Sequence, residues 1–363
     1  MFNKKLFASK LKDLVPYKVD TNKYKARLDA NESFIQMPQE MRNKFTEAIR
    51  ALDFNRYPDP DATSLCEAFA DFYGIEAENV AAGNGSDEII SIIMNGFLDK
   101  GSCVMTFSPD FSMYNFYAEL AELKSVSCPK TKGDLQIDYQ KADSMLKENN
   151  VKLCIFSNPC NPTGRIEKKA DIAELASKNP DTIFIVDEAY MDFAGELAKS
   201  ESFLADCSEY SNIIVLKTLS KALGSAALRL GFIVGDKSVI AMFKAVKSPY
   251  NVNSVSQSFG EAVLRQKDML KSCINKITDM RKELFTAISE QNLTGADKPY
   301  KMYTNFVFFE SPKAEKIYTE LKNRGILVRY FKIGDGALRI TTGNADENRM
   351  LLDEMRNILS SCR

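Results

Sequence analysis

Apolar, strand-like runs alternate with helix-like segments through the middle of the chain, and this alternation constrains the fold more than any other feature. We expect strands at residues 103–107, 152–157, 182–186, 213–216 and 230–234. Helices are expected at 86–98, 111–123 and 167–178. Alternation of this kind predicts an α/β fold with a mostly parallel sheet covered by helices on both faces.

The pattern changes near residue 255. From there to about residue 291 it is helical over many turns without proline, and we expect this stretch to bridge two units. Strands at 305–310, 326–330 and 337–341, with a helix at 312–324, predict a second, smaller α+β unit. We therefore divide the chain into an N-terminal segment (1–45) that joins the small domain, a large domain (46–254), and the bridging helix with the small domain (255–363).

Composition excludes several classes of function. The net charge of −1 gives no reason to expect nucleic acid as a partner, and no apolar run is long enough to span a bilayer. None of the eight cysteines forms a C-x-x-C pair, and the N-terminus lacks the features of a signal peptide, so we expect a cytoplasmic protein with reduced thiols.

The chain contains no histidine. This excludes Ser-His-Asp and Cys-His catalysis and metal sites built on histidine. Proton transfer at neutral pH must then use lysine, tyrosine, aspartate or glutamate, and a lysine tuned by its surroundings is the leading general base.

One stretch, residues 218–229, places a lysine between two apolar runs. Burial would push Lys221 towards the neutral amine, which attacks carbonyls and forms Schiff bases. Thr218 and Ser220 can donate to phosphate oxygens, and Arg229 can bind phosphate with its planar fork. A Schiff-base lysine beside a phosphate cradle suits pyridoxal 5′-phosphate. The alternative is a surface loop rich in serine and lysine.

Two loops that follow expected strands are candidate ligand contacts. The glycines before Ser86 and Asp87 open a helix, where free backbone N–H groups and the helix dipole favour an anion. The alternative there is an ordinary helix cap. Two Asn-Pro pairs force a turn at 158–162, in which a rigidly held Asn161 can offer its amide to a ligand; the alternative is a tight loop without contacts.

Charged residues at two further strand ends complete the set. Asp187 ends a buried strand, where a carboxylate is costly unless paired, and a protonated pyridine nitrogen would be a suitable partner, with Tyr190 within reach of the ring's phenolic oxygen. An acidic pair that caps a helix and a magnesium ligand are the alternatives. Arg339 lies within an apolar strand and Arg329 ends the preceding one, which favours an anionic substrate over structural ion pairs.

In their order along the chain, these motifs resemble fold-type-I pyridoxal-phosphate aminotransferases, and among them the histidinol-phosphate aminotransferases. The resemblance runs from about residue 14 to 342. Its pieces are Leu14-Val15-Pro16-Tyr17, Asp29-Ala30-Asn31-Glu32, Asn55-Arg56-Tyr57-Pro58, Gly85-Ser86-Asp87-Glu88, Asn161-Pro162-Thr163-Gly164, Asp187-Glu188-Ala189-Tyr190, Ser220-Lys221 with Arg229, and Leu338-Arg339-Ile340-Thr341.

The resemblance implies a seven-stranded sheet in the large domain and a role for each site residue. Lys221 holds the cofactor as a Schiff base and moves the substrate proton, while Asp187 pairs with the pyridine nitrogen. Asn161 and Tyr190 bind the phenolic oxygen, and Phe111 stacks on the ring. The phosphate is held by Ser86, Asp87, Thr218, Ser220 and Arg229. The substrate is held by Tyr17, Asn31, Arg329 and Arg339, and no metal is implied.

The activity implied is a ping-pong amino transfer from histidinol phosphate to a 2-oxo acid, typically 2-oxoglutarate, in histidine biosynthesis. The family's tyrosine at the Tyr57 position reaches the neighbouring subunit's active site, which implies a homodimer. The alternatives are a decarboxylase of O-phosphothreonine or O-phosphoserine and an aromatic amino acid aminotransferase. A non-catalytic binding protein is disfavoured by the intact Lys221, and a magnesium-dependent phosphotransferase by the lack of a G-x-x-x-x-G-K-[ST] loop.

Overall fold

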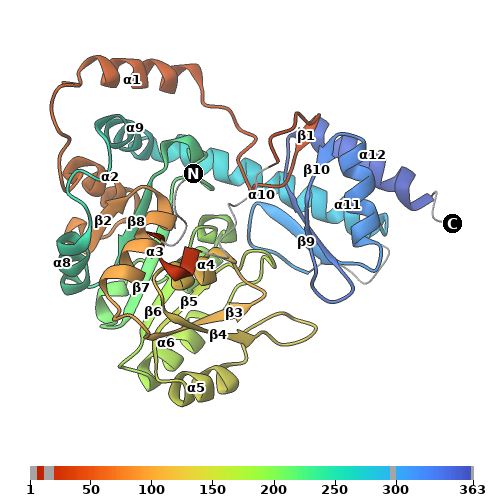
Figure 1. Ribbon diagram of the computed structural model, residues 1–363. Coiled ribbons are helices and arrows are strands. Elements are labelled where there is room, and N and C mark those ends of the chain that lie inside the picture. Colours follow the sequence, from red (N-terminus) through yellow and green to blue (C-terminus); the bar gives the residue numbers. More distant parts are fainter. Residues whose placement is uncertain (1–5, 12–19, 295–299, 361–363) are drawn as a thin grey trace.

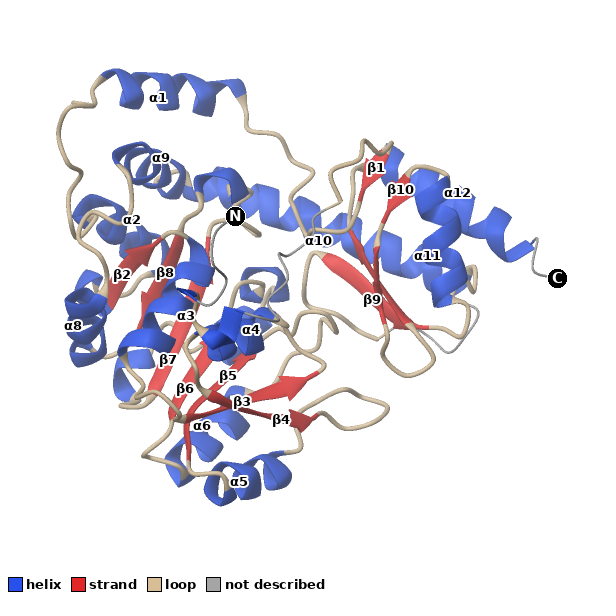
Figure 2. Ribbon diagram, viewed as in Figure 1, coloured by secondary structure: helices blue, strands red, loops and turns tan. Residues whose placement is uncertain are grey.

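Seven strands form the larger sheet of the computed structural model, which describes residues 6–11, 20–294 and 300–360 (Figures 1 and 2). In spatial order the strands are β2 (Val80–Gly83), β8 (Gly231–Val234), β7 (Ile213–Thr218), β6 (Ile183–Asp187), β5 (Val151–Ser157), β3 (Cys103–Ser108) and β4 (Lys124–Pro129). Strand β8 pairs antiparallel with both β2 and β7, and the five strands β7, β6, β5, β3 and β4 pair in parallel, so the expected mostly parallel sheet is confirmed.

Helices cover both faces of this sheet. Phe184 and Val186 of β6 pack into the core under α2 (Thr63–Tyr73), α5 (Tyr139–Glu148), α6 (Lys169–Lys178) and α9 (Ser254–Leu264). Ile185, between them, packs into the opposite core under α3 (Gly85–Gly96), α4 (Met113–Leu120) and α8 (Lys237–Val246). Successive strand residues face opposite sides, so burial of both faces requires the continuous apolar runs seen in the sequence.

A second region contains two small sheets. Strands β9 (Phe306–Glu310), β12 (Ala337–Thr341) and β11 (Arg329–Phe331) form an antiparallel sheet with β12 in the middle. Close to the N-terminus, β1 (Ala26–Arg27) pairs in parallel with β10 (Ile326–Leu327). The helices α11 (Ala314–Asn323) and α12 (Ala345–Ser360) pack on these strands around a separate apolar core.

Helix α10 (Lys267–Glu290) runs from α9 to the small sheets, as Figure 1 shows. We expected one helical stretch from 255 to 291, but the chain breaks between α9 and α10 at Arg265 and Gln266. Neither proline nor glycine marks this break, so the sequence pattern could not reveal it. Helix α1 (Gln39–Arg50) contacts α9, and the short α7 (Leu197–Glu201) follows β6.

Three further elements differ from the expectation. The strand expected at 326–330 is two strands, because the chain changes partner from β1 to β12 at Val328. Strand β2 was not expected because its residues are small and carry little strand preference. Strand β4 was not expected because it lies at the sheet edge and alternates exposed polar residues with Val126 and Cys128.

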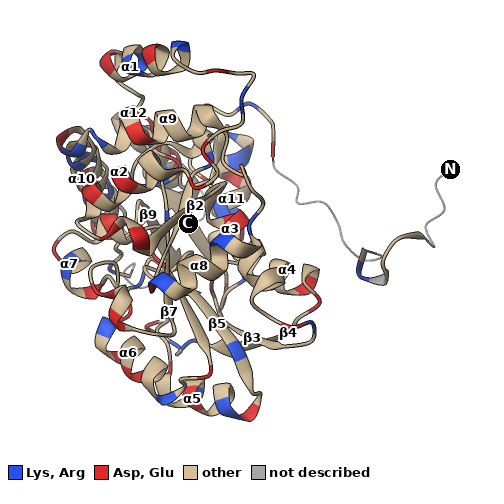
Figure 3. Ribbon diagram, turned by 90° about the vertical axis from the view of Figure 1, so that its left-hand side faces the viewer, with Lys and Arg blue, Asp and Glu red and all other residues tan. Residues whose placement is uncertain are grey.

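The expected domain boundary at residues 45 and 46 falls inside α1, and the division of the chain into domains stays a prediction. Short 3₁₀ turns lie at Ser9–Leu11, Ala77–Asn79, Met191–Ala194, Cys207–Glu209 and Ala226–Leu228. Acidic and basic residues are mixed over the helices, as Figure 3 shows and as the net charge near zero suggests. None of the described helices combines the length and the apolar character that a bilayer crossing requires.

Strand β8 begins at Gly231, which lies against the start of α3. A Cβ atom at this position would overlap the backbone of Gly85 and Ser86, whereas one at Gly235 would meet only ordinary van der Waals neighbours. We predict that Gly231→Ala lowers the free energy of unfolding by about 1–3 kcal/mol, the usual cost of overpacking. Gly235→Ala, just beyond the other end of the same strand, is the matched control and should cost less. Urea denaturation of both variants measures the difference, and equal losses would contradict this prediction.

Candidate active site

Most of the candidate site residues lie at the carboxyl edge of the large sheet. Ser157, Asp187 and Thr218 are the last residues of the neighbouring parallel strands β5, β6 and β7. The loops after these strands carry Asn161, Tyr190 and Lys221. Open α/β sheets bind ligands at this edge, because the chain there leaves the sheet and its polar groups are free to face a ligand.

The carboxylate of Asp187 is buried. Tyr114 donates its hydroxyl to Oδ2 at 2.9 Å, and the backbone N–H of Ala189 donates to Oδ1 at 3.1 Å. Burial raises the pKa of Asp187 to about 6, although the hydrogen bond from Tyr114 lowers it. Asp187 is therefore mostly ionised at neutral pH, and its charge favours a cationic partner in this position.

Asn161 connects the large sheet to the small one. Its backbone N–H donates to the Ser157 hydroxyl at 2.9 Å, and its side-chain oxygen accepts from the Arg339 guanidinium. Arg339 lies on β12 with its guanidinium carbon 5.4 Å and 5.7 Å from the ring centres of Phe306 and Phe331. Aromatic faces stabilise a cation in this geometry. The hydrogen bond to Asn161 places the charge of Arg339 at the carboxyl edge of the large sheet.

Three consecutive residues, 29–31, hold three candidate side chains from distant parts of the chain. Arg339 donates to the Asp29 carbonyl, Lys221 Nζ donates to the Ala30 carbonyl at 2.9 Å, and Asn31 Nδ2 donates to the Tyr190 hydroxyl at 2.8 Å. We call residues 29–31 the crossing segment, because these bonds join residues of both sheet regions.

The crossing segment is itself fixed at Asn31, a buried residue with a φ of 55°. Its backbone N–H donates to the Thr341 hydroxyl at 2.9 Å, and its carbonyl accepts from Asn305 Nδ2 at 3.0 Å. Asparagine tolerates this left-handed conformation better than most residues. Neither Thr341 nor Asn305 was among the expected site residues, and only their partners across the fold identify them.

Lys221 is partly buried and lies among other cations. Burial and the positive charges of Arg339 and Arg229 together lower its pKa to about 8, against an opposing effect of Glu32. A substantial fraction of this amine is therefore neutral near physiological pH, as expected for a nucleophile that attacks carbonyls.

A group of polar and basic residues lies where β7, β8 and α3 meet. Helix α3 begins at Gly85 without a side-chain cap, so the N–H groups of its first turn, with Ser86 and Asp87, point out of the helix end. Arg229 Nη2 lies 3.4 Å from Asp87 Oδ2, and it lies so close to Gly85 that a side chain there would collide with it.

The end of β7 adds two hydroxyl groups to these residues. Thr218 Oγ1 lies 3.0 Å from Ser220 Oγ and accepts from the Ser220 backbone N–H at 3.1 Å. Both hydroxyls are buried. Together with the helix N-terminus and a guanidinium, they form the donor set that a phosphate group requires.

Phe111 lies just before α4, and its ring meets the ring of Tyr114 edge-to-face, with the centroids 5.4 Å apart. Tyr114 thus joins the expected stacking residue to Asp187, a role that the sequence analysis missed. Its position three residues after Phe111 on a helical pattern, with a polar tip on a buried ring, is the signal that could have found it.

Two expected residues are exposed, unlike the buried members of this group. Tyr57 is 81% exposed and stacks on Tyr250 with the ring centres 4.7 Å apart. Arg329 is exposed on β11, directly opposite Arg339 of β12. Tyr17 lies outside the described residues. Within the described parts of the chain, no group of three or more cysteine, aspartate and glutamate side chains is arranged to hold a metal ion.

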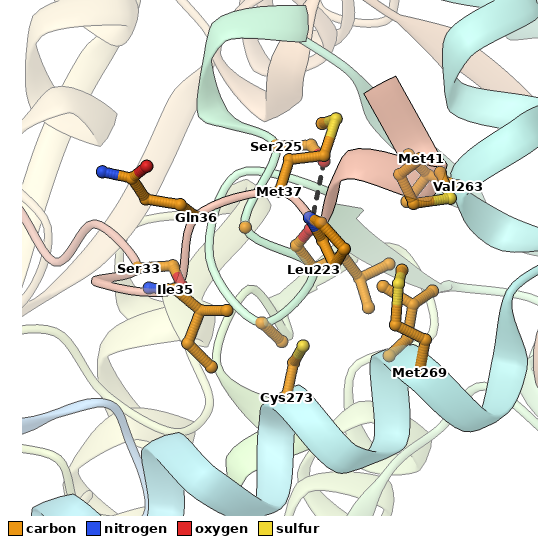
Figure 4. Close-up of a pocket in the computed structure, with 14 residues that line it drawn as sticks. Ser33, Ile35, Gln36, Met37, Met41, Leu223, Ser225, Val263, Met269 and Cys273 are labelled. Carbon is orange, nitrogen blue, oxygen red and sulfur yellow. Dashed lines mark hydrogen bonds between the residues drawn. The ribbon is translucent and has the colours of Figure 1, made fainter. Parts of the chain in front are cut away.

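A small pocket of about 50 Å³ lies behind the loop that follows Lys221, and Figure 4 shows its lining. Ser33, Ile35 and Met37 come from the chain after the crossing segment, while Leu223 follows the lysine. Met269 and Cys273 of α10 lie across from them, and the lining is mostly apolar. These apolar side chains pack against the loop that follows Lys221.

Comparison with known proteins identifies the family. Residues 23–355 match the family described as aminotransferase class I and II. The chain is 42% identical to a histidinol-phosphate aminotransferase of Clostridium novyi (strain NT), over 94% of each protein. It is 38% identical to one of Clostridium kluyveri, over 98% of this chain and 99% of the other.

Solved structures agree on the fold. The histidinol-phosphate aminotransferase of Sinorhizobium meliloti, solved in complex with pyridoxal 5′-phosphate, superposes with a TM-score of 0.88 over 99% of each chain at 22% identity. One from Clostridium acetobutylicum superposes with a TM-score of 0.83, over 93% of this chain and 99% of the other, at 21% identity. The resemblance noted in the sequence is thereby confirmed, and the chain belongs to the class I and II aminotransferases and, within them, to the histidinol-phosphate aminotransferases.

Proposed function

We propose that this protein is a pyridoxal-phosphate-dependent aminotransferase that takes its amino group from histidinol phosphate and passes it to 2-oxoglutarate. The observation that carries the proposal is the crossing segment, whose three consecutive residues bring Lys221, Tyr190 and Arg339 to the carboxyl edge of the large sheet. Relatives with the same name over nearly the full length support the choice of reaction.

The residues of this edge fit pyridoxal phosphate. A buried carboxylate, Asp187, suits the cationic pyridine nitrogen, and the donor groups at Gly85, Thr218 and Arg229 suit the phosphate. When bound, the cofactor supplies a carbonyl that condenses with amines and a ring that withdraws electrons from the substrate's Cα.

Each residue of the chain then has a physical task. The Asp187 carboxylate keeps the ring nitrogen protonated, while Asn161 and Tyr190 orient the ring through its phenolic oxygen. Phe111 covers one face of the ring. Lys221, whose pKa of about 8 allows it both to accept and to donate a proton near neutral pH, takes the proton from the substrate's Cα and returns it.

The substrate's acidic group is assigned to two arginines. Arg329 and Arg339 are directly opposite in the antiparallel pair β11–β12, and their side chains therefore share one face. Like charges placed in this way repel each other, so an anion between them is favoured. We propose that this pair binds the phosphate of the donor and the carboxylate of the acceptor in turn, with Asn31 and Tyr17 beside them.

We also propose a homodimer. Several large apolar side chains are exposed on the loop between α1 and α2 and on and after α8: Phe54, Tyr57, Met242, Val246 and Tyr250. Exposed apolar groups of this size are typical of an interface between proteins. Burial of this face against a second copy would place Tyr57 near that copy's phosphate site.

The first test is a single turnover. The purified protein loaded with cofactor is mixed with histidinol phosphate and no oxo acid, and the absorbance of the lysine-bound cofactor is followed. We expect this band to disappear and 2-oxoglutarate to restore it. No change would reject this donor, and release of carbon dioxide from O-phosphothreonine would reject the reaction class.

The second test concerns the amine of Lys221. Only the neutral amine captures the cofactor's aldehyde, so the rate of capture by the protein freed of cofactor should rise with pH to half its maximum near pH 8. Arg339→Met removes a nearby positive charge and should move this midpoint upwards. Arg339→Lys retains the charge and is the matched control. Stopped-flow mixing at a series of pH values measures the midpoint, and Lys221→Ala should capture no cofactor.

The third test concerns the shared site. Tyr57→Phe should weaken cofactor binding, and Lys221→Ala should abolish turnover. A purified heterodimer of one chain of each kind contains one site with both groups intact if Tyr57 acts on the partner's site. We therefore expect the heterodimer to turn over at a low cofactor concentration, at which the Tyr57→Phe homodimer is mostly unloaded and the Lys221→Ala homodimer is inactive. A heterodimer without such turnover would show that Tyr57 serves its own chain.

A further inference from the structure

Asp110 is a buried carboxylate between two residues of the proposed cofactor site. It directly precedes Phe111, and its side chain is 1% exposed. Its Oδ1 atom accepts the backbone N–H of Phe111 at 2.8 Å. The same oxygen accepts the hydroxyl of Ser157, the last residue of β5.

Ser157 continues this connection to the other side of the site. Its hydroxyl oxygen accepts the backbone N–H of Asn161 at 2.9 Å, and its own N–H points to Asp110 at 3.3–3.4 Å. A short relay therefore runs from Asp110 through Ser157 to Asn161. A single carboxylate oxygen thus fixes the backbone next to Phe111 and, through one hydroxyl, the backbone of Asn161.

Lys130 neutralises this carboxylate. It follows β4, its side chain is fully buried, and its Nζ lies 3.5 Å from Asp110 Oδ2. Burial raises the pKa of Asp110, while Lys130, Ser157 and Phe111 oppose that shift. A buried ion pair generally contributes little to net stability because both charges lose their hydration, so its place beside the cofactor site calls for another explanation.

We propose that Asp110 is a positioning residue that sets Phe111 and Asn161 relative to each other, with Lys130 as its counter-ion and Ser157 as its link. This inference rests on the proposed function, in which Phe111 covers the cofactor ring and Asn161 donates to its phenolic oxygen. Both residues would contact the bound ring, and a common anchor would hold them at a fixed distance from each other.

The test uses Ser157→Ala, which removes the link to Asn161 and leaves the Asp110–Lys130 pair in place. A donor at the phenolic oxygen stabilises the deprotonated form of the bound cofactor. A misplaced Asn161 should therefore raise the pH midpoint of the cofactor's absorbance change, by about half a pH unit or more. Cofactor affinity should also fall.

Ser202→Ala is the matched control. Its hydroxyl is likewise buried, donates to the buried carboxylate of Glu188 at 2.6 Å and accepts a backbone N–H, from Leu204 at 3.1 Å, but it has no link to Asn161. It should leave the midpoint at the parent value. Equal midpoints for the parent and both serine variants would overturn the inference, and so would equal shifts in the two variants.

A double variant addresses Asp110 itself. Asp110→Leu with Lys130→Met removes the acceptor and both charges without leaving a buried ion alone. It should raise the midpoint in the same direction and weaken cofactor binding. An unchanged midpoint in a folded double variant would overturn the inference, and Ser157→Ala decides alone where the double variant does not fold. A parent protein that binds no pyridoxal phosphate would instead reject the proposed function.

Discussion

Hydrogen bonds from three consecutive residues, 29–31, hold the candidate site together. Through them, side chains from the lysine loop, from the turn after β6 and from β12 meet at one place, although Asn31 and Tyr190 are 159 residues apart and Asp29 and Arg339 are 310 apart. The segment crosses between the two sheet regions and is anchored by Thr341 and Asn305. The geometry of the site thus depends on how the small region sits against the large one, and less on either sheet alone.

The surroundings of Lys221 and Asp187 shift the pKa values of both groups towards neutral pH. Burial and the charge of Arg339 lower the pKa of Lys221 to about 8, and burial raises the pKa of Asp187 to about 6. Environments that bring the pKa values of an amine and a carboxylate closer together in this way are typical of sites that transfer protons. The same desolvation makes a cationic partner for Asp187 favourable, which is the physical basis for its proposed contact with the ring nitrogen.

Much of the site could be predicted from the sequence because strand ends are visible in it. Asp187 and Thr218 end buried apolar runs, and Lys221 follows one, so the order of strands places them at one edge. The sequence could not reveal that Arg339 donates to Asn161, because pairing across 178 residues leaves no local pattern. The relay from Asp110 was missed for the same reason. Lys130 follows an edge strand that the sequence did not predict, and its charge gave no sign that it would be buried against Asp110.

The proposed proton transfers rest on Lys221, and the chain contains no imidazole, which has a consequence for the supply of the protein. Translation of these 363 residues requires no charged histidyl-tRNA. A cell that has exhausted its histidine can still complete every copy of this chain, at the moment when an enzyme proposed to help make that amino acid is needed most. The end product of the proposed pathway is thus absent from the amino acids required to build this chain.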